Sequence, residues 1–422
     1  MGGKAILIVV LSISLTFFFI GVNYNRMTLS ASDNMTNYAN KQISHCIAVT
    51  GVNIACNAFY IDPNWTAGYS NVSCMGGSYS VTVQTLDAVK LIKSITCIST
   101  FKGFKDTVHG AVLYYLPDYH DTIIVTFQPS RFSRYAYYSS SEGGSPIYWA
   151  TGDTVKGPLQ TQDYLRVSGN PVFLGFVGTK MGVLNKNGSA DHPQFLGGLL
   201  TGSNIPINTS GVSSVEAFAL TNGYEFTGHD TVYLNFQGDS VKYRYAWNTK
   251  DTTKKLSTMT PNGVLFVKGG TARIRGKIKG QYTLGCSYVS KGGSVYLDSS
   301  IAYNTNPISN PNSTDIFGVV TQNNFTITDN KANNNSVTIQ ASIYCQSGSF
   351  GAENYSTRGF DGYINLLGGV VQAIRGAVGV IGNDGTISNG FSKSYSYDRR
   401  FMFSAPPNFP NTGSYNVISW YE

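Results

Sequence analysis

The sequence predicts a mainly β protein that begins with one long α-helix. Three observations lead to this prediction. The stretch from Ala5 to Val22 contains no charged residue. The chain holds 46 glycines, 28 tyrosines and 23 phenylalanines, whereas only 13% of its residues are charged. Because glycine suits tight turns and aromatic residues favour strands, many short strands are expected after the helix.

The N-terminal helix is expected to span residues 1–62. Its apolar run, AILIVVLSISLTFFFIGV, would cover about 27 Å, close to the hydrocarbon thickness of a bilayer. Beyond the run, apolar and small residues recur every three to four positions, at Met35, Ala39, Ile43, Ile47, Gly51, Ile54 and Ala58. This seam predicts that the helix continues and packs against a globular part until Asp62-Pro63 ends it.

Two other interpretations of the N-terminus stay open. A secretory signal peptide would be cleaved at the small residues Ser30-Ala31-Ser32, which lie well beyond the apolar run. A plain single-pass anchor would need only the run itself. Lys4 precedes the run and Arg26 follows it, so the flanking charges barely favour either orientation in the membrane.

The region after the helix divides into four parts. Residues 63–129 are expected to form a small antiparallel sheet packed on the helix, because Ser80 to Leu86 alternates and Gly76-Gly77 and Gly103 provide turns. Residues 130–202 would begin a β-solenoid, residues 203–258 would be an insertion with a hairpin, and residues 259–422 would complete the solenoid with a C-terminal cap.

The solenoid prediction comes from short strands of three to six residues with Gly or Asn at the corners. Tight bends of this kind suit a parallel β-helix whose coils stack on one another. A β-sandwich is the alternative. In the insertion, Val232–Phe236 and Val241–Tyr245 predict a hairpin, and Val215–Leu220 predicts a short helix capped by Ser213 or Ser214.

The six cysteines form no Cys-x-x-Cys motif, so neither a zinc site nor a redox motif is expected. Cys74 and Cys97 flank a predicted hairpin and would form a disulfide in an oxidising compartment. The alternative is that they are free, small buried hydrophobic residues.

No catalytic or cofactor motif is present, and the five histidines lack metal-ligand spacing. The net charge of +7 comes without a long basic cluster, so nucleic acid is not an expected partner. These features indicate a non-enzymatic protein without cofactors. The alternative is a membrane-anchored protein that binds or degrades polysaccharide, with Asp153 and Asp163 as carboxylates near Arg166 and His192. We favour turn-capping roles for the two aspartates.

Aromatic residues near the start of the solenoid are candidates for binding a surface polysaccharide or a partner. Tyr137, Tyr148 and Trp149 are expected to face such a ligand. The alternative is that they pack inside the solenoid.

The N-terminus resembles a known group of proteins through MGGKAILIVVLSISLTFFFIGVN, Asn37-Tyr38 and the segment from Ile47 to Ala55. It is similar to PilX-type minor pilins and to the K-type pseudopilins of type II secretion, which, like this chain, lack a glutamate in the apolar run. The resemblance implies prepilin processing between Gly3 and Lys4. It also implies that the apolar half of the helix enters the membrane and later contacts other pilins or pseudopilins, through Ala5, Ile8, Leu11, Leu15, Phe18 and Val22.

Several further blocks resemble an uncharacterised bacterial family with a PilX-like stem and a β-helix-like head. They include Ile147 to Asp163, Gly263 to Val267, Gly348 to Tyr355, Gly368 to Gln372 and Tyr395 to Arg400. That family has no settled function, but the resemblance of the N-terminus to minor pilins and pseudopilins implies a non-enzymatic protein of the bacterial cell envelope, anchored by a single membrane pass with its head in the periplasm or at the surface. It would be a minor component of a type IV pilus or a type II secretion-like apparatus, acting in assembly or adhesion.

Overall fold

The chain forms two compact units in the computed structural model, which describes residues 2–61, 65–87, 92–111, 122–143, 147–245, 250–382 and 387–421. The first, called the stem unit here, comprises Met1–Gln128 and Ser414–Glu422. The second, the head unit, comprises Pro129–Gly413. The chain therefore passes from stem to head once and returns once.

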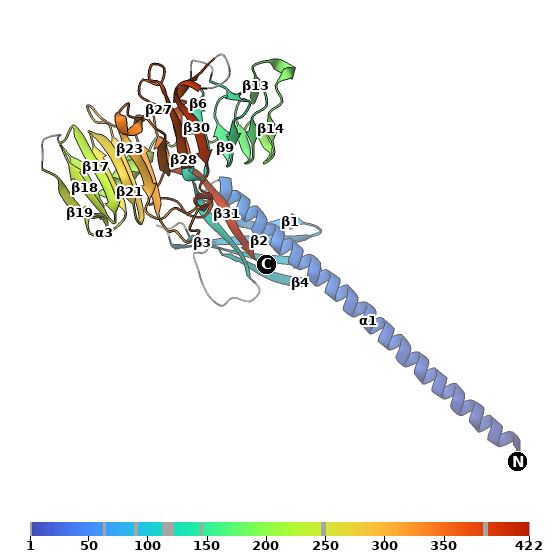
Figure 1. Ribbon diagram of the computed structural model, residues 1–422. Coiled ribbons are helices and arrows are strands. Elements are labelled where there is room, and N and C mark those ends of the chain that lie inside the picture. Colours follow the sequence, from blue (N-terminus) through green and yellow to red (C-terminus); the bar gives the residue numbers. More distant parts are fainter. Residues whose placement is uncertain are drawn as a thin grey trace. The chain divides into compact units, whose positions relative to one another are not determined.

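The helix α1 runs without interruption over Gly2–Ile61, 60 residues (Figure 1). The prediction of one long N-terminal helix is confirmed, although Asp62-Pro63, expected to end it, lies outside the described residues. No proline occurs before Pro63, so every residue can donate its amide to the helical pattern. Hydroxyl groups within the helix bond back to the carbonyl four residues earlier, as Ser12 does to Ile8 and Thr16 to Ser12.

The stem unit also contains a sheet whose strands follow the order β1-β2-β3-β4-β5-β31. Their bounds are β1 Tyr69–Cys74, β2 Gly77–Asp87, β3 Ile92–Phe101, β4 Phe104–Ala111, β5 Thr122–Arg131 and β31 Asn411–Tyr421. The first four form an antiparallel meander. Two-residue turns at Met75-Gly76 and Lys102-Gly103 connect β1 to β2 and β3 to β4, with positive φ at all four residues as hairpin turns of this type require.

Two features of this sheet differ from the sequence prediction. β4 and β5 pair in parallel, with His109 opposite Thr122, so the sheet is not wholly antiparallel. The last strand, β31, belongs to this sheet from Ser414 onward, whereas residues 259–422 were assigned to the solenoid and its cap. Neither feature is visible locally, because a strand's partner is set by long-range packing and not by its own alternation.

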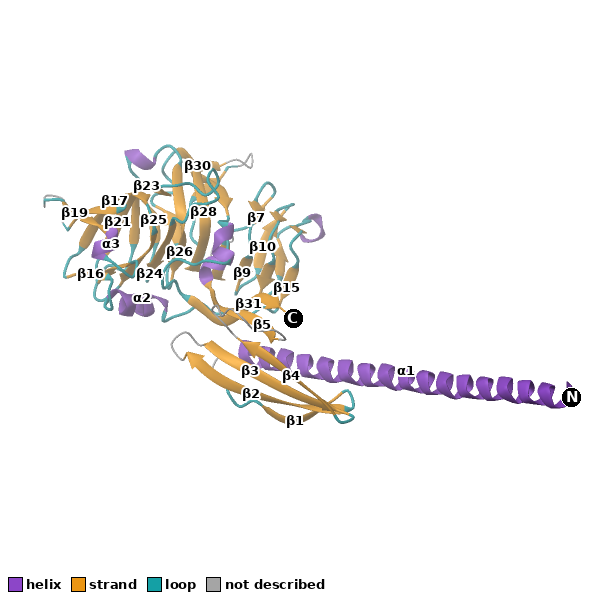
Figure 2. Cartoon of the chain, turned by 90° about the horizontal axis from the view of Figure 1, so that it is seen from below, coloured by secondary structure: helices purple, strands orange, loops and turns teal. Residues whose placement is uncertain are grey.

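α1 packs on the sheet through the last part of its length (Figure 2). Ile47, Ala48, Val52 and Ala55 are fully buried there, against Tyr79, Val81, Ile95 and Cys97 of β2 and β3. Gly51 lies where the helix and the sheet approach each other tightly, since a methyl group on it would overlap Cys97 Sγ and lie 2.8 Å from Tyr79 Cδ2. A glycine in mid-helix is unfavourable for the helix, so the tight contact with the sheet explains why glycine occupies this position.

The head unit is built mainly from parallel strands. One long ladder of them runs, in spatial order, β16 (Tyr224–Thr227), β20 (Val264–Lys268), β22 (Gln281–Ser287), β24 (Ile316–Thr321), β26 (Val337–Cys345), β28 (Phe360–Ile374), β6 (Tyr137–Ser141), β9 (Leu159–Thr161), β12 (Val177–Thr179) and β15 (Leu199–Thr201). Every neighbouring pair in this ladder is parallel.

Further ladders line the other sides of the head unit. A second parallel ladder joins β17 (Thr231–Gly238), β21 (Thr271–Ile278), β23 (Val295–Tyr303), β25 (Phe325–Ile327), β27 (Phe350–Ala352) and β30 (Ile387–Ser396), together with parts of β26 and β28. Two short ones contain β7 (Trp149–Ala150), β10 (Leu165–Ser168) and β13 (Val183–Asn185), and β8 (Thr154–Val155), β11 (Val172–Phe173) and β14 (Gln194–Phe195).

The remaining elements of the head unit are antiparallel additions and short helices. The predicted hairpin is present as β17 and β18 (Ser240–Arg244), with Gln237 opposite Ser240, and β19 (Thr252–Lys255) extends it. Because β17 also pairs with β21, this segment continues the parallel ladder instead of lying beside it. The other elements are β29 (Gly379–Ile381), α3 (Leu256–Met259) and single 3-10 turns at Phe132–Arg134, Gly188–Ala190, Lys331–Asn333 and Arg399–Met402.

The chain enters the long ladder in its middle. From β6 it proceeds through β9 and β12 to β15, one end of the ladder, and then crosses to β16, the opposite end. From β16 it returns strand by strand until β28 pairs with β6, with Val370 opposite Tyr137. In Figure 1, β17 to β19 and β13 to β14 accordingly lie at opposite ends of the head, with β28 and β6 between them.

The crossing segment contains α2 (Gly211–Ala219), which covers the outer face of the ladder. Val215 and Ala219 pack with Val264, Phe266 and Val320 of the strands beneath. The short helix was predicted, but its N-cap is Ser210 and not Ser213 or Ser214, and the side chain of Ser210 does not cap it. Instead, the amide of Val212 donates to Gln346 Oε1 at 2.8 Å.

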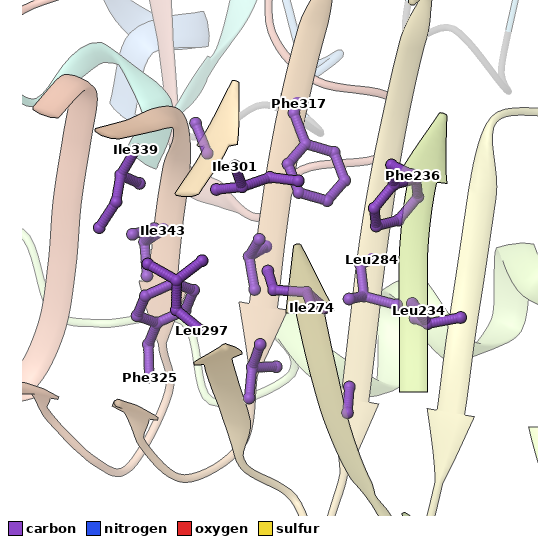
Figure 3. Packing of buried hydrophobic residues seen from close by; sticks show 14 of the residues in the cluster. Leu234, Phe236, Ile274, Leu284, Leu297, Ile301, Phe317, Phe325, Ile339 and Ile343 are labelled. Carbon is purple, nitrogen blue, oxygen red and sulfur yellow. The ribbon is translucent and has the colours of Figure 1, made fainter. Parts of the chain in front are cut away.

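The interior of the head unit consists of stacked side chains at matching register. Leu265, Leu284, Val319, Ile343 and Val370 occupy one row and are at most 1% exposed. Figure 3 shows part of this core, where Leu284 and Ile343 lie among side chains of neighbouring strands such as Leu234, Ile274 and Leu297. The row continues in register through Tyr137, Leu159 and Val177, which belong to a second buried cluster beyond the point where β28 meets β6.

Candidate functional site

The N-terminal part of α1 is apolar and has no partner among the residues that the structure describes. Ile8, Leu11, Leu15 and Phe18 are each more than half exposed, and Ala5 and Val22 belong to the same stretch of helix. Gly3 and Lys4 lie in the first turn and are also exposed. In water an apolar surface of this size is unfavourable, so it requires lipid or another protein.

This is the one helix, among the described residues, that is long and apolar enough to cross a membrane. Its most apolar 18-residue window has a mean hydropathy of 2.5 and is not buried within the protein. The finding supports a membrane-anchored protein.

Between the apolar run and the sheet, the predicted seam is only partly buried. Ile47 and Gly51 face the sheet as expected, whereas Met35 is 76% exposed and Ile54 is 37% exposed. A spacing of four residues turns about 40° around a helix at each step. Met35 therefore lies roughly 120° around the axis from Ile47, on a face that the sheet does not reach.

The expected disulfide between Cys74 and Cys97 is not formed, and all six cysteines are free. Cys74 lies on β1 and Cys97 on β3, with β2 between them. Two strand spacings amount to roughly 9–10 Å, beyond the Cα separation that a disulfide tolerates. Burial raises the pKa of Cys97 to about 12, so this thiol is unreactive in the folded protein.

Two of the three aromatic residues predicted to face a ligand belong to the core instead. Tyr137 and Trp149 are each 4% exposed, and their rings meet edge to face with centroids 5.1 Å apart. Tyr137 is fixed in the interior row by Val370 and Leu159 on either side. Tyr148 is half-buried, and the ammonium of Lys186 lies 5.2 Å from the centroid of its ring.

A small pit opens beside these two core aromatics. Its volume is about 60 Å³, and it is lined from two regions distant in sequence. One wall comes from β7, β8 and their turn, with Trp149, Asp153 and Lys156. The other wall comes from β28 and β30, with Lys393, Tyr395 and Tyr397. The pit therefore lies where β28 and β30, late in the sequence, meet β7 and β8, which come early in the head unit.

Lys393 is the one lysine on an interior row of β30. It pairs with the fully buried Ile364, so its Cβ lies on the inward side of the strand, whereas the residue as a whole is exposed at the mouth of the pit. Its ammonium lies 5.7 Å from the centroid of the Trp149 ring. The pKa of Lys393 is lowered to about 8, chiefly because the walls remove water from the ammonium and further because Arg375 repels it.

Behind the pit, a buried ion pair links Glu142, which follows β6, to Arg375, which follows β28. Arg375 Nη1 lies 2.6 Å from Glu142 Oε2, and the two side chains are 3% and 0% exposed. The guanidinium also lies over the Trp149 ring, 4.6 Å from its centroid. Tyr137 and Ser139 donate hydroxyl hydrogen bonds to Glu142 Oε1, so the carboxylate is well satisfied in the interior.

The aspartates considered as catalytic carboxylates bind turn amides. Asp153 Oδ2 accepts from the amide of Ala150 at 2.9 Å, and Asp163 accepts from the amides of Glu142 and Tyr164. This is the turn-capping role favoured from the sequence. No group of three metal-ligand side chains comes together within the described ranges.

The pit residues on β30 were missed in the sequence, although a signal was present. Phe391, Lys393, Tyr395 and Tyr397 alternate with serine and place the lysine on the apolar face of the strand. A lysine in such a series is unusual, because burying an ammonium is unfavourable without compensation.

Comparisons with known proteins identify neither a family nor a curated relative. No family model matches the chain. No curated protein matches it either. Three chains of solved structures match, among them the crystal structure of the competence-associated pilin ComZ from Thermus thermophilus. The match to this chain has a TM-score of 0.40 and 11% identity, and it covers 90% of the present chain and 97% of the other.

Proposed function

We propose that the protein is a non-enzymatic, pilin-like protein of the bacterial cell envelope, anchored by the N-terminal part of α1. In this proposal it is a minor component of a type IV pilus or a type II secretion-like apparatus. The head acts in assembly or adhesion, in the periplasm or at the cell surface. The helix would first lie in the membrane and then contact other pilins or pseudopilins.

The observation that carries the proposal is the division of one continuous helix into two environments. Ile6 to Ile20 expose apolar side chains, whereas Ile47 to Phe59 are packed on the stem sheet. A simple anchor needs no such continuation into a folded unit. A single helix that spans both environments couples the stem unit to whatever surrounds the apolar part, as a subunit inserted among other helices requires.

For the head unit we propose a parallel β-solenoid. Parallel ladders with side chains stacked at matching register support this assignment, and so do the short strands with glycines at the corners. The architecture suits a minor subunit because a stack of coils gives a large surface on a single stem.

The test is the N-terminal mass of the mature protein, recovered separately from membranes and from material sheared off the cell surface. A chain that begins at Lys4 and occurs in the sheared fraction would support prepilin processing and the pilus assignment. A chain that begins at Met1 and stays in membranes would reduce the proposal to a plain anchor. A start close to Asp33 would contradict it in favour of a secreted protein.

A further inference from the structure

We propose that the pit at Lys393 binds the carboxylate of an acidic sugar residue. The inference concerns the head unit alone, and it holds whether or not the protein enters a pilus. It names a site and a ligand class that the role in assembly does not require.

The first argument is the state of the lysine. Within the part of the chain that the structure describes, the ammonium of Lys393 forms neither a hydrogen bond nor an ion pair. Its inward direction is imposed by the register with Ile364. A cation held in a pit without an anionic partner is costly, and an incoming carboxylate supplies that partner.

The second argument is the presence of polar groups without partners in the same walls. The indole N–H of Trp149 and the hydroxyl of Tyr397 are buried and find no hydrogen-bond partner among the described residues. Trp149 is 4% exposed and Tyr397 8% exposed, so water does not reach these atoms freely. Buried polar groups normally have partners, so these two are unusual, and a ligand would reach them only after the side chains that cover them have moved.

The third argument is the balance of charge around the lysine. Asp153 and Lys156 line the pit, and the charges of Arg375 and Glu142 behind it offset each other. The two positive charges of Lys393 and Lys156 outnumber the one negative charge of Asp153, which leaves a net charge of +1. An anionic group is therefore favoured, and one oxygen of Asp153 remains available to accept a hydroxyl hydrogen bond, because the other binds Ala150.

The size of the pit restricts the ligand to one small group of a larger molecule. One water molecule needs roughly 10–15 Å³ of such space, so about 60 Å³ accommodates a carboxylate and its nearest atoms. The remainder of the sugar would lie at the mouth, beside Asp153 and the tyrosines. A carboxylate with adjacent hydroxyl groups, as in a uronic acid, matches both the cation and the acceptor.

The test is calorimetric titration of the full-length protein in detergent at pH 7 and constant ionic strength, with D-glucuronate, D-glucose and acetate as separate probes. We expect glucuronate to bind more tightly than either of the others. Lys393→Met should weaken glucuronate binding by about tenfold or more. Lys279→Met, which removes an exposed lysine elsewhere in the head unit, is the matched control and should bind as the unaltered protein does.

Three outcomes would overturn the inference. Equal binding of glucuronate and acetate would mean that the sugar contributes nothing. Binding of glucose as strong as that of glucuronate would exclude a role for the carboxylate. Undiminished binding by Lys393→Met would place the ligand elsewhere. The structural integrity of this variant can be checked by its melting temperature, so a loss of binding can be separated from a loss of fold.

Discussion

Arg375 and Glu142 are 233 positions apart in sequence and form an ion pair that is almost completely buried. Glu142 directly follows β6, the first strand of the long ladder, and Arg375 directly follows β28, the strand that returns to meet it. The pair therefore joins the first and the last strand that the chain contributes to the long ladder.

Replacing Arg375 by methionine should destabilise the head unit by about 3–5 kcal/mol, because it leaves the carboxylate of Glu142 buried without its cation. Thermal unfolding of the full-length protein is the measurement. The double variant Glu142→Gln/Arg375→Met should be more stable than Arg375→Met alone. Asp230→Asn, which breaks the exposed Lys291–Asp230 pair, should leave the melting temperature unchanged. Equal stability of the single and double variants would argue against this account.

Gly51→Ala should loosen α1 from the stem sheet. The added methyl group would press on Cys97 Sγ and on the Tyr79 ring, and overpacking of this kind costs about 1–3 kcal/mol. The better helix propensity of alanine offsets at most about 1 kcal/mol. The measurement is the rate at which Cys97 reacts with a thiol reagent, which should rise. Gly21→Ala, on the same helix with no atom within 4 Å of the new methyl group, should leave that rate unchanged.

The thiols should differ sharply in native reactivity. Cys46 is exposed and should be alkylated quickly, whereas Cys97, Cys286 and Cys345 should react only after unfolding, because burial raises the pKa of each to about 12. Mass spectrometry after alkylation of the native and of the denatured protein gives the number of thiols that react in each state. A mass lower by two hydrogens, mapped to Cys74 and Cys97, would contradict the strand order of the stem sheet.

A charge within the apolar run should weaken membrane attachment. Leu11→Lys places an ammonium near the middle of the apolar run, where insertion costs about 2.5–3.5 kcal/mol. The fraction that stays with membranes after an alkaline wash should fall. Met27→Lys lies just beyond the run on an equally exposed part of the helix and should not change that fraction. If both variants behave alike, the run is not the membrane-embedded part.

Lys393 should make stability depend on pH. Its pKa in the folded protein, about 8, lies below its ordinary value of 10.5, so the unfolded chain binds more protons between these values. The cost of charging Lys393 in the pit is therefore fully present below pH 8 and disappears as the pH rises toward 10.5. Lys393→Met should raise the melting temperature at pH 7, and this gain should shrink at pH 10. A rise in melting temperature that is the same at pH 7 and at pH 10 would mean that the methionine stabilises the protein by packing and not by removing the charge.

The fold was predictable where the signal is local. The long helix follows from an apolar run and the absence of proline, and the β17–β18 hairpin follows from alternation on both sides of Gln237-Gly238-Asp239. The partners of β5 and β31 could not be predicted, because a strand's alternation says nothing about which strand lies beside it. For the same reason Cys74 and Cys97 looked adjacent when β2 lies between them.

The candidate site was predicted only in outline. Trp149 lines the pit, but as a buried wall and not as an exposed platform, because its position is set by Val167 on the next strand. Lys393 was missed because its neighbours in the pit precede it by some 240 positions. Alternation placed it on an inward face, yet only the pairing of β28 with both β6 and β30 brings it beside Trp149.

The chain enters the long ladder of the head unit in its middle, and this affects how the protein can fold during synthesis. β6 lies between β28 and β9, so during synthesis one edge of β6 stays open until Phe360–Ile374 has been produced. An open edge invites pairing with other chains, and contacts so distant in sequence form slowly. A chain that stops before Phe360 would have a gap in the centre of its ladder instead of a shorter ladder. Unlike ordinary repeat proteins, this head cannot be trimmed from its C-terminal end and remain a smaller version of itself.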